Sequence, residues 1–360
     1  MPTFIVDPDI STAHTLDKAF YTSPAHFEAA KEKLFAPSWQ FIGHAGLVEA
    51  TESAVPVTLL EHFLDEPLVL VKDKAGTIRC LSNVCTHRGN LLVTAPCHAD
   101  KLRCNYHGRQ FHLDGRFAHM PEFKEVKDFP SPSDDLRNMP LHTWGKLLFT
   151  SLDPSADPRA TFADMEARLH WLPMHQPAFR PDLSRDYEVK ANWALYTENF
   201  LEGFHIPFVH PTLNKMLDFG DYVTELFPRS VLQIGIARKG EACFDIPEGS
   251  PDRGRKIAAY YWWIFPNTMF NFYPWGLSIN VVRPLCVDRT MVSFLSYVYD
   301  ASKLGTGAGG ALDEVEKEDE EVVESVQRGI RSRAYAHGRY SVTREQGTHH
   351  FHRIIAELMG

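Results

Sequence analysis

The sequence predicts an α+β fold in two domains, a small all-β domain and a larger one in which helices flank an antiparallel sheet. The chain has 360 residues, a length that suits about two domains. Short apolar runs separated by turn residues fill the segment 39–154, whereas the segment 155–360 mixes helical periodicity with strand-like runs. The change of pattern near residue 154 marks the expected boundary.

A helical segment over residues 1–38 is expected to precede the all-β domain and to pack on the larger domain. Ser23 and Pro24 have the composition of a helix N-terminus, and they open a predicted helix over 26–34. In the all-β domain, turn signals such as Lys-Ala-Gly separate the strand-like runs at 54–60, 68–72 and 147–152.

The larger domain should contain helices and a sheet. Helical patterns cover 161–170, 192–205 and 312–337, and strand-like runs follow one another between about 230 and 298. The strand-like runs are consecutive, which favours antiparallel pairing.

Composition excludes some classes of protein. The chain is 44% hydrophobic and 23% charged, and its net charge of −9 disfavours nucleic acid as a partner. We find no apolar run of a length that crosses a membrane, and the start lacks the pattern of a signal peptide, so we expect a cytoplasmic protein without a membrane segment. The six cysteines show no disulfide framework.

Two short motifs in the first domain offer paired metal ligands. Cys85-x-His87 and Cys104-x-x-His107 supply two thiolates and two imidazoles. Such a set can hold a tetrahedral zinc ion. It can also hold a [2Fe-2S] cluster in which the thiolates bind one iron and the imidazoles bind the other.

A second constellation lies in the predicted helix 192–205. Glu198, Glu202 and His205 are spaced i, i+4 and i+7, which places them on one face of a helix. Pro207 should end the helix near His205, so that His210 can turn toward the same point. On the opposite face we expect a packed aromatic stripe of Tyr196, Phe200 and Phe204. The alternative for either histidine is a hydrogen-bonded surface residue.

A third ligand for such an ion is predicted in the helix 312–337, which carries many acids. Asp319 falls within the apolar stripe formed by Leu312, Val315, Val322, Val326 and Ile330. A charged acid on a buried face needs a partner, and a metal ion is an adequate one. The remaining acids of this helix are interpreted mostly as a solvated face.

These motifs resemble those of the Rieske non-heme iron oxygenases. The first pair continues as Cys85-x-His87-Arg-Gly and the second as Cys104-x-Tyr-His107-Gly, with sixteen residues between His87 and Cys104. In the second domain an acid precedes His-x4-His by three residues, as in the mononuclear iron motif of this family. One departure is Arg109, where many relatives have Trp. This difference puts in doubt the docking of the electron donor or the reduction potential of the cluster, but not cluster binding. The resemblance covers nearly the whole chain.

The resemblance implies a terminal oxygenase α subunit with a helix-grip-like catalytic domain. It implies a Rieske [2Fe-2S] cluster on Cys85, His87, Cys104 and His107, and a mononuclear Fe(II) on His205, His210 and Asp319. O2 would be activated with electrons from a separate NAD(P)H-dependent reductase, because the chain has no Gly-rich dinucleotide fingerprint. It also implies that Glu202 bridges the mononuclear iron to the cluster of a neighbouring subunit, and hence a homotrimer.

The sequence says least about the substrate. Glu202 in place of the usual Asp, the modest length and the C-terminal segment 345–352 resemble the branch that acts on quaternary amines, by monooxygenation or N-demethylation. The aromatic run 260–275 can be a cage for a quaternary ammonium group or simply packed strands, and packing is favoured for most of it. The alternatives are hydroxylation of an aromatic ring and, from another class, a pure electron-transfer Rieske protein.

Overall fold

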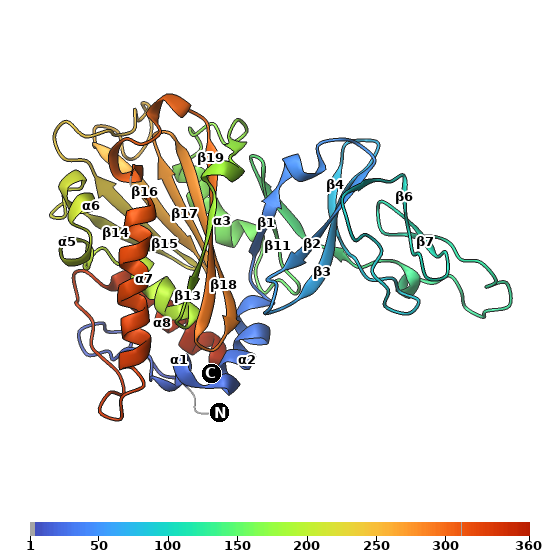
Figure 1. Ribbon diagram of the computed structural model, residues 1–360, viewed down its shortest axis with the longest axis horizontal. Coiled ribbons are helices and arrows are strands. Elements are labelled where there is room, and N and C mark those ends of the chain that lie inside the picture. Colours follow the sequence, from blue (N-terminus) through green and yellow to red (C-terminus); the bar gives the residue numbers. More distant parts are fainter. Residues whose placement is uncertain (1–3, 311) are drawn as a thin grey trace. The chain divides into compact units, whose positions relative to one another are not determined.

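The computed structural model describes residues 4–310 and 312–360, which form two compact units (Figure 1). One unit is Trp39–Pro154. The other combines the chain up to Ser38 with Ser155–Gly360. The N-terminal segment therefore folds with the C-terminal part of the chain, and the smaller unit is an insertion between them.

The smaller unit is built from three antiparallel sheets, which agrees with the predicted all-β domain. A five-stranded sheet has the order β5-β2-β3-β4-β9, and two three-stranded sheets have the orders β6-β7-β8 and β1-β11-β10. The strands are β1 (Gln40–His44), β2 (Ser53–Leu59), β3 (Glu66–Lys72), β4 (Ile78–Ser82), β5 (Cys97–His98), β6 (Lys101–Arg103), β7 (Gln110–His112), β8 (Phe117–His119), β9 (Asn138–Met139), β10 (Leu141–Trp144) and β11 (Leu147–Thr150).

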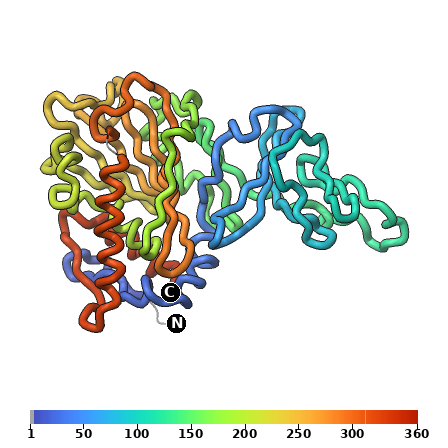
Figure 2. The backbone as a smooth tube through the Cα atoms, in the orientation of Figure 1, coloured from blue at the N-terminus to red at the C-terminus, as the bar shows by residue number. Residues whose placement is uncertain are grey.

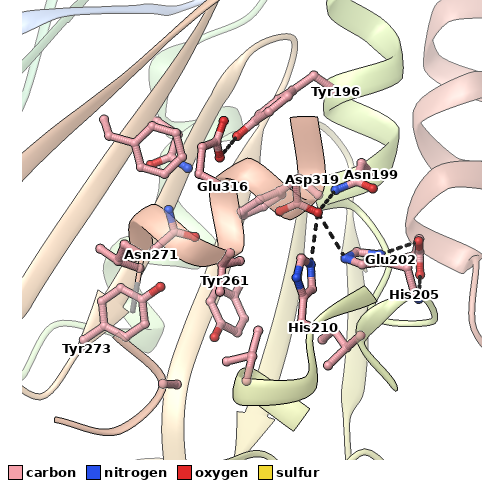
Figure 3. Close-up of a pocket in the computed structure, with 18 of the residues that line it drawn as sticks. Tyr196, Asn199, Glu202, His205, His210, Tyr261, Asn271, Tyr273, Glu316 and Asp319 are labelled. Carbon is pink, nitrogen blue, oxygen red and sulfur yellow. Dashed lines mark hydrogen bonds and ion pairs between the residues drawn. The ribbon is translucent and has the colours of Figure 1, made fainter. Parts of the chain in front are cut away.

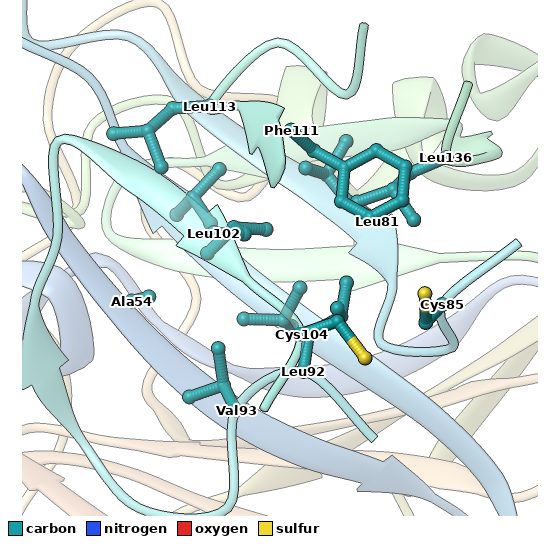
Figure 4. Close-up of a cluster of buried hydrophobic side chains, with 12 residues drawn as sticks. Ala54, Leu81, Cys85, Leu92, Val93, Leu102, Cys104, Phe111, Leu113 and Leu136 are labelled. Atoms are coloured by element: carbon teal, nitrogen blue, oxygen red, sulfur yellow. The ribbon is translucent and has the colours of Figure 1, made fainter. Parts of the chain in front are cut away.

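One core joins the five-stranded sheet to the β6-β7-β8 hairpins (Figure 4). Val69 and Val71 alternate along β3 toward it, and Leu102 and Phe111 enter from the facing hairpin. Cys85 and Cys104 belong to the same cluster, each only 2% exposed. The core thereby anchors both predicted ligand motifs at their cysteines.

The larger unit contains an eight-stranded antiparallel sheet. Its order is β12-β19-β18-β17-β16-β15-β14, and β13 also pairs with β19. The strands are β12 (Ala178–Phe179), β13 (Arg185–Val189), β14 (Val223–Phe227), β15 (Ser230–Ile236), β16 (Ile257–Ile264), β17 (Thr268–Tyr273), β18 (Gly276–Cys286) and β19 (Arg289–Val298). The central strands are buried on both faces, which explains why β16 and β17 are so aromatic.

Helices flank this sheet as expected. They are α1 (Ala19–Thr22), α2 (Pro24–Ala30), α3 (Pro158–Arg168), α4 (Trp193–Phe200), α5 (Ile206–Val209), α6 (Pro211–Met216), α7 (Leu312–Gly329) and α8 (Gln346–Met359). A π-helical turn, Lys31–Phe35, extends α2, and 3-10 turns occupy Ala45–Val48, Pro132–Asp134, Pro181–Leu183, Ala301–Lys303 and Gly307–Gly309. Within the described residues, no helix is long and apolar enough to span a membrane.

The N-terminal and C-terminal segments of the larger unit run beside each other (Figure 2). Lys33 donates from Nζ to the carbonyl of Met359 at 2.9 Å, and Nε2 of His349 lies 2.7 Å from the carbonyl of Asp7. Ser23 and Pro24 begin α2 as predicted, with the proline in the first turn. These contacts join the N-terminal segment of the larger unit to α8.

The prediction of one helix over 192–205 is wrong. α4 ends at Phe200, and Pro207 lies in the first turn of α5 rather than at a helix end. Between the two helices Gly203 packs so closely on Tyr222 that an added Cβ would lie 2.8 Å from the ring. Because the helix ends at Phe200, Phe204 does not continue the expected aromatic stripe of Tyr196 and Phe200. Its side chain is 41% exposed. The helix therefore ends where the sequence pattern continues, and Gly203 provides the close contact with Tyr222.

The helix predicted over 312–337 is confirmed but ends at Gly329, and its buried face is shifted. Val326 is exposed, whereas Glu316 and Gln327 are buried. One oxygen of each side chain has a partner, because Glu316 accepts a hydrogen bond from Tyr196 at 2.7 Å and Gln327 accepts one from the Asn192 N–H at 2.7 Å. A pattern of apolar residues cannot reveal a face that is buried through polar partners.

Candidate metal centres

Each of the two Cys/His motifs forms a turn closed by the same pair of backbone hydrogen bonds. The N–H of Cys85 donates to the carbonyl of Asn90 at 2.9 Å, and the N–H of Gly89 donates back to the Cys85 carbonyl at 3.0 Å. Cys104 and Gly108 repeat these bonds at 2.8 and 3.0 Å. Both glycines have positive φ, +73° and +76°, a conformation that favours glycine. The shared geometry of the two turns explains the Gly that closes each motif.

The two turns place like ligands side by side. The thiols of Cys85 and Cys104 hydrogen-bond to each other, and the rings of His87 and His107 have centroids 4.9 Å apart. Burial acts to raise the pKa of Cys104, but hydrogen bonds from the Tyr106 N–H and from the Cys85 thiol lower it overall. The cysteines are buried, whereas His107 is exposed. The two thiols therefore lie in the core of the smaller unit, and the two imidazoles lie nearer to its surface.

This pairing fits a two-iron cluster better than a single zinc ion. A tetrahedral zinc site requires four ligand atoms around one point. Within the described residues, the only group of three or more candidate ligands that meets within 4.8 Å lies elsewhere, at His205, His210 and Asp319. Two cysteines for one iron and two histidines for the other is the ligand division of a Rieske cluster.

Arg109, the departure from the family motif, is a buried residue. Its side chain is 2% exposed and pairs with Asp134 at 2.7 Å. The guanidinium carbon lies 5.6, 5.1 and 5.4 Å from the ring centroids of Phe111, Phe117 and Phe129. The arginine is therefore built into the wall behind the second motif and is not part of an exposed docking surface.

In the larger unit, three side chains from three elements converge (Figure 3). His205 precedes α5, His210 separates α5 from α6, and Asp319 lies on α7. Nε2 of His210 lies 3.0 Å from Oδ1 of Asp319, and Nε2 of His205 lies 3.5 Å from the same oxygen. The short helix α5 separates the two histidines so that both rings lie near the carboxylate of Asp319. Two imidazoles and one carboxylate are the ligands of a facial triad for non-heme iron.

A carboxylate holds the other ring nitrogen of each histidine. Nδ1 of His205 lies 2.7 Å from Oε1 of Glu202, and Nδ1 of His210 lies 2.6 Å from Oε2 of Glu318. Such contacts fix the tautomer that leaves Nε2 free for a metal. Burial acts to lower the pKa of His210, but the hydrogen bonds to Asp319 and Glu318 outweigh it and raise that pKa.

Sequence reasoning missed two supporting residues. Glu318 was assigned with the other acids to a solvated face, yet it orients His210. Asn199 donates from Nδ2 to Oδ1 of Asp319 at 2.6 Å. Glu318 could have been found from its position beside Asp319 on α7, whereas nothing in the sequence pattern distinguishes Asn199.

Glu198 does not share a face with Glu202 and His205, contrary to expectation, because α4 ends between them. Oε1 of Glu198 lies 3.0 Å from Nε2 of His352, which is fully buried in α8. Tyr340 places its hydroxyl 2.5 Å from the other ring nitrogen of His352. Glu198 therefore serves the packing of α4 on α8 and lies outside the lining of the pocket.

The converging side chains open into a pocket between the sheet and the helices α4 to α7. Its walls are mostly aromatic and aliphatic, with amide, acidic and histidine side chains among them: Tyr196, Asn199, Phe200, Glu202, His205, Ile206, His210, Leu213, Tyr222, Tyr261, Asn271, Tyr273, Asn280, Phe294, Ala308, Leu312, Val315, Glu316 and Asp319. From the aromatic run, only Tyr261, Asn271 and Tyr273 face this pocket. Tyr260 bonds to Asp252 instead, and Trp263 packs on Phe351. Strand alternation thus splits the run between pocket and core.

Comparison with known families now identifies the class of protein. Residues 177–360 match the family described as ring hydroxylating alpha subunit, catalytic domain, and residues 38–130 match the Rieske [2Fe-2S] domain. The first match alone covers half of the chain, so the chain belongs to the Rieske oxygenase α subunits. It is an oxidoreductase of a family that carries a Rieske [2Fe-2S] cluster and a mononuclear iron.

Within this family the chain is similar to oxygenases named for quaternary amines. The chloroplastic choline monooxygenase of Beta vulgaris is 29% identical and covers 98% of this chain and 79% of its own. The carnitine monooxygenase oxygenase subunit of Escherichia coli strain K12 is 28% identical, with 96% and 94% covered. The solved structure of a quaternary ammonium Rieske monooxygenase shares the fold, with TM-score 0.79, 23% identity and 99% and 100% coverage.

Proposed function

We propose that this chain is the terminal oxygenase of a system that hydroxylates a quaternary amine at the expense of O2 and NAD(P)H. The observation that carries the proposal is the convergence of His205, His210 and Asp319 at a mostly apolar pocket whose lining also includes aromatic rings and further acidic side chains. Aromatic faces and carboxylates both attract an organic cation. The similarity to choline and carnitine monooxygenases supports the same substrate class.

The proposed ligands divide between the two units. Cys85, His87, Cys104 and His107 hold the [2Fe-2S] cluster, and His205, His210 and Asp319 hold Fe(II). When bound, these groups supply single-electron transfer and the activation of O2. The chain's own residues position the chemistry, since Glu202 and Glu318 orient the two histidines and Asn199 orients Asp319.

Hydroxylation of an N-methyl group would release formaldehyde, the demethylated amine and a proton. Hydroxylation of another carbon bonded to nitrogen would split that C–N bond into an amine, a larger aldehyde and a proton, and hydroxylation farther from nitrogen would leave an intact hydroxylated amine. The product therefore distinguishes N-demethylation from simple monooxygenation. The electrons would come from a separate NAD(P)H-dependent reductase that docks on the smaller unit, where His107 is exposed.

Glu202 is proposed to link the mononuclear site to the cluster of a neighbouring subunit in a homotrimer. Its Oε1 lies at Nδ1 of His205, and its Oε2 accepts the backbone N–H groups of Phe204 and His205. These bonds hold the carboxylate rigidly beside an iron ligand. Inter-subunit electron transfer has been described for the solved quaternary ammonium Rieske monooxygenase, which supports the same arrangement in this chain.

The test is O2 uptake by the iron-loaded protein with an NADH-dependent reductase, over quaternary amines and aromatic acids. We expect uptake with choline-like amines, matched by formaldehyde or by an oxidised amine in equal amount. Coupled turnover with aromatic acids alone would replace the proposed substrate class by ring hydroxylation. Uncoupled uptake is recognised by hydrogen peroxide without product, and it does not count as support.

A further inference from the structure

The lining of the pocket has more acidic than basic side chains. Among the described lining residues there are three carboxylates, Glu202, Glu316 and Asp319, and no lysine or arginine. Asp319 belongs to the proposed iron ligands, and Glu202 is held by His205 and two backbone N–H groups. Glu316 belongs to neither arrangement, and no lysine or arginine of the described lining stands beside it.

Glu316 is also incompletely bonded. It is 2% exposed, and Tyr196 donates to its Oε2 at 2.7 Å. Its other oxygen, Oε1, is buried and has no hydrogen-bond partner among the described residues. Burial raises the pKa of this carboxyl well above its usual range, so an adjacent cation would stabilise the ionised form. A buried acceptor without a partner points to a ligand that supplies the missing interaction.

Glu316 also lies close to the residues that are proposed to hold the iron. It lies on α7 one helical turn before Asp319, and both face the same pocket (Figure 3). Side chains at i and i+3 on a helix are about 5–6 Å apart at Cβ. A trimethylammonium group that contacts Glu316 therefore has its methyl groups close to the converging His205, His210 and Asp319.

We propose that Glu316 is the cation-binding residue of this pocket and that it restricts the substrate to amines that carry a positive charge and no carboxylate. The aromatic walls formed by Phe200, Tyr261 and Tyr273 complete the site for the methyl groups. A zwitterion such as carnitine or glycine betaine would bring its carboxylate beside Glu316, and the described lining offers no lysine or arginine to receive it. Choline, whose hydroxyl can bond to Asn271 or Asn280, has the matching chemistry. The inference rests on the proposed function and names its substrate class more narrowly.

The first experiment compares ligands on the wild-type holoenzyme by anaerobic isothermal titration calorimetry. The ligands are choline, tetramethylammonium, carnitine, glycine betaine and the neutral isostere of choline in which a tert-butyl group replaces trimethylammonium. We expect choline and tetramethylammonium to bind, and the two zwitterions and the isostere to bind at least roughly 30-fold more weakly.

The second experiment uses three variants. Glu316→Gln keeps the size and the bond from Tyr196 but removes the charge, so choline affinity should fall roughly 30-fold while the isostere is unaffected. Tyr196→Phe removes the bond that lowers the pKa of Glu316, so it should weaken choline binding in the same direction as Glu316→Gln but by a smaller factor. Glu321→Gln lies on the exposed face of the same helix and should behave as wild type. Iron content and the visible spectrum check that each variant is folded.

Each outcome decides between the proposals. Carnitine or glycine betaine that binds as tightly as choline, or a Glu316→Gln variant with unchanged choline affinity, overturns the role of Glu316 and leaves the oxidation of amines intact. A wild-type protein that binds none of the amines but turns over aromatic acids overturns both.

Discussion

His205 and His210 direct the same ring nitrogen, Nε2, at Asp319 because a carboxylate occupies Nδ1 of each ring. The two carboxylates come from different places, Glu202 from the turn after α4 and Glu318 from α7. At the scale of single residues, the site thus depends on groups that are not ligands themselves.

Glu318 offers a direct test of this support. Glu318→Ala removes the partner of His210 Nδ1, and we expect the affinity for mononuclear iron to fall by about 10- to 100-fold. Competition with a chelator measures the affinity, and the absorption of the cluster reports that the smaller unit is intact. Glu321→Ala, on the exposed face of α7, is the matched control. Equal iron affinity in both variants would show that Glu318 does not orient the ligand.

Arg109 should act on the cluster through its charge. A positive charge in the buried wall behind the second motif favours the reduced, more negative cluster, so Arg109→Gln should lower its reduction potential. Redox titration followed by electron paramagnetic resonance measures the change. Arg116 is 75% exposed, and its charge is screened by solvent, so Arg116→Gln should leave the potential nearly unchanged. A shift of the same size in both variants would contradict the electrostatic explanation.

At the scale of elements, the turn that carries Glu202 depends on helix packing. Gly347 in α8 lies against the carbonyl of Leu201, the residue between α4 and Glu202. The contact between half-buried Glu198 and buried His352 holds the same two helices together. α8 therefore supports the site from behind without lining the pocket.

Gly347→Ala tests this packing. The added Cβ would lie 2.3 Å from the Leu201 carbonyl oxygen, so backbone must move, at a cost of about 1–3 kcal/mol in unfolding free energy. We expect a lower melting temperature and a smaller fraction of mononuclear iron after loading. Gly329→Ala at the end of α7 meets nothing within 4 Å and should change stability by no more than about 1 kcal/mol. A stable Gly347→Ala variant with full iron content would exclude the role assigned to α8.

At the scale of the whole molecule, the two proposed metal sites lie in separate compact units. The proposed ligands Cys85, His87, Cys104 and His107 lie in Trp39–Pro154, and the other proposed ligands lie in the larger unit. Each unit has its own sheets and its own buried cluster of side chains. The sites should therefore be separable by mutation.

His205→Ala should remove the mononuclear iron and product formation but preserve the visible spectrum of the cluster. Iron analysis should fall from about three to about two atoms per chain, since the cluster contains two irons. Loss of the visible spectrum together with the iron would show that the two units do not fold independently.

Glu202→Gln should retain both metals and bind substrate, but transfer electrons between the sites much more slowly. Rapid mixing of the reduced, substrate-bound variant with O2 measures reoxidation of the cluster. We expect turnover to fall at least about 100-fold, because the link from His205 to the neighbouring cluster loses its charged acceptor. Undiminished turnover would eliminate the bridging role. Size-exclusion chromatography of the wild-type protein and of Glu202→Gln controls for loss of the oligomer.

Much of the fold follows from local patterns in the sequence. The short strands β2, β3 and β11 and the helices α2, α3 and α7 lie where period and turn residues predict them, although α7 ends several residues early. Both Cys/His motifs are also local, because their ligands are separated by one or two residues and each turn closes on its own glycine. Such features need no distant partner.

Other features depend on contacts between distant segments. The break after α4 is accompanied by the packing of Tyr222 on Gly203, and the buried face of α7 pairs its polar side chains with Tyr196 and Asn192. The sequence by itself determined the class of protein, the motifs and the residues that converge. The tertiary structure alone decided how these residues are supported and which charges remain in the pocket, because burial and pairing arise only when the sheet and α7 come together.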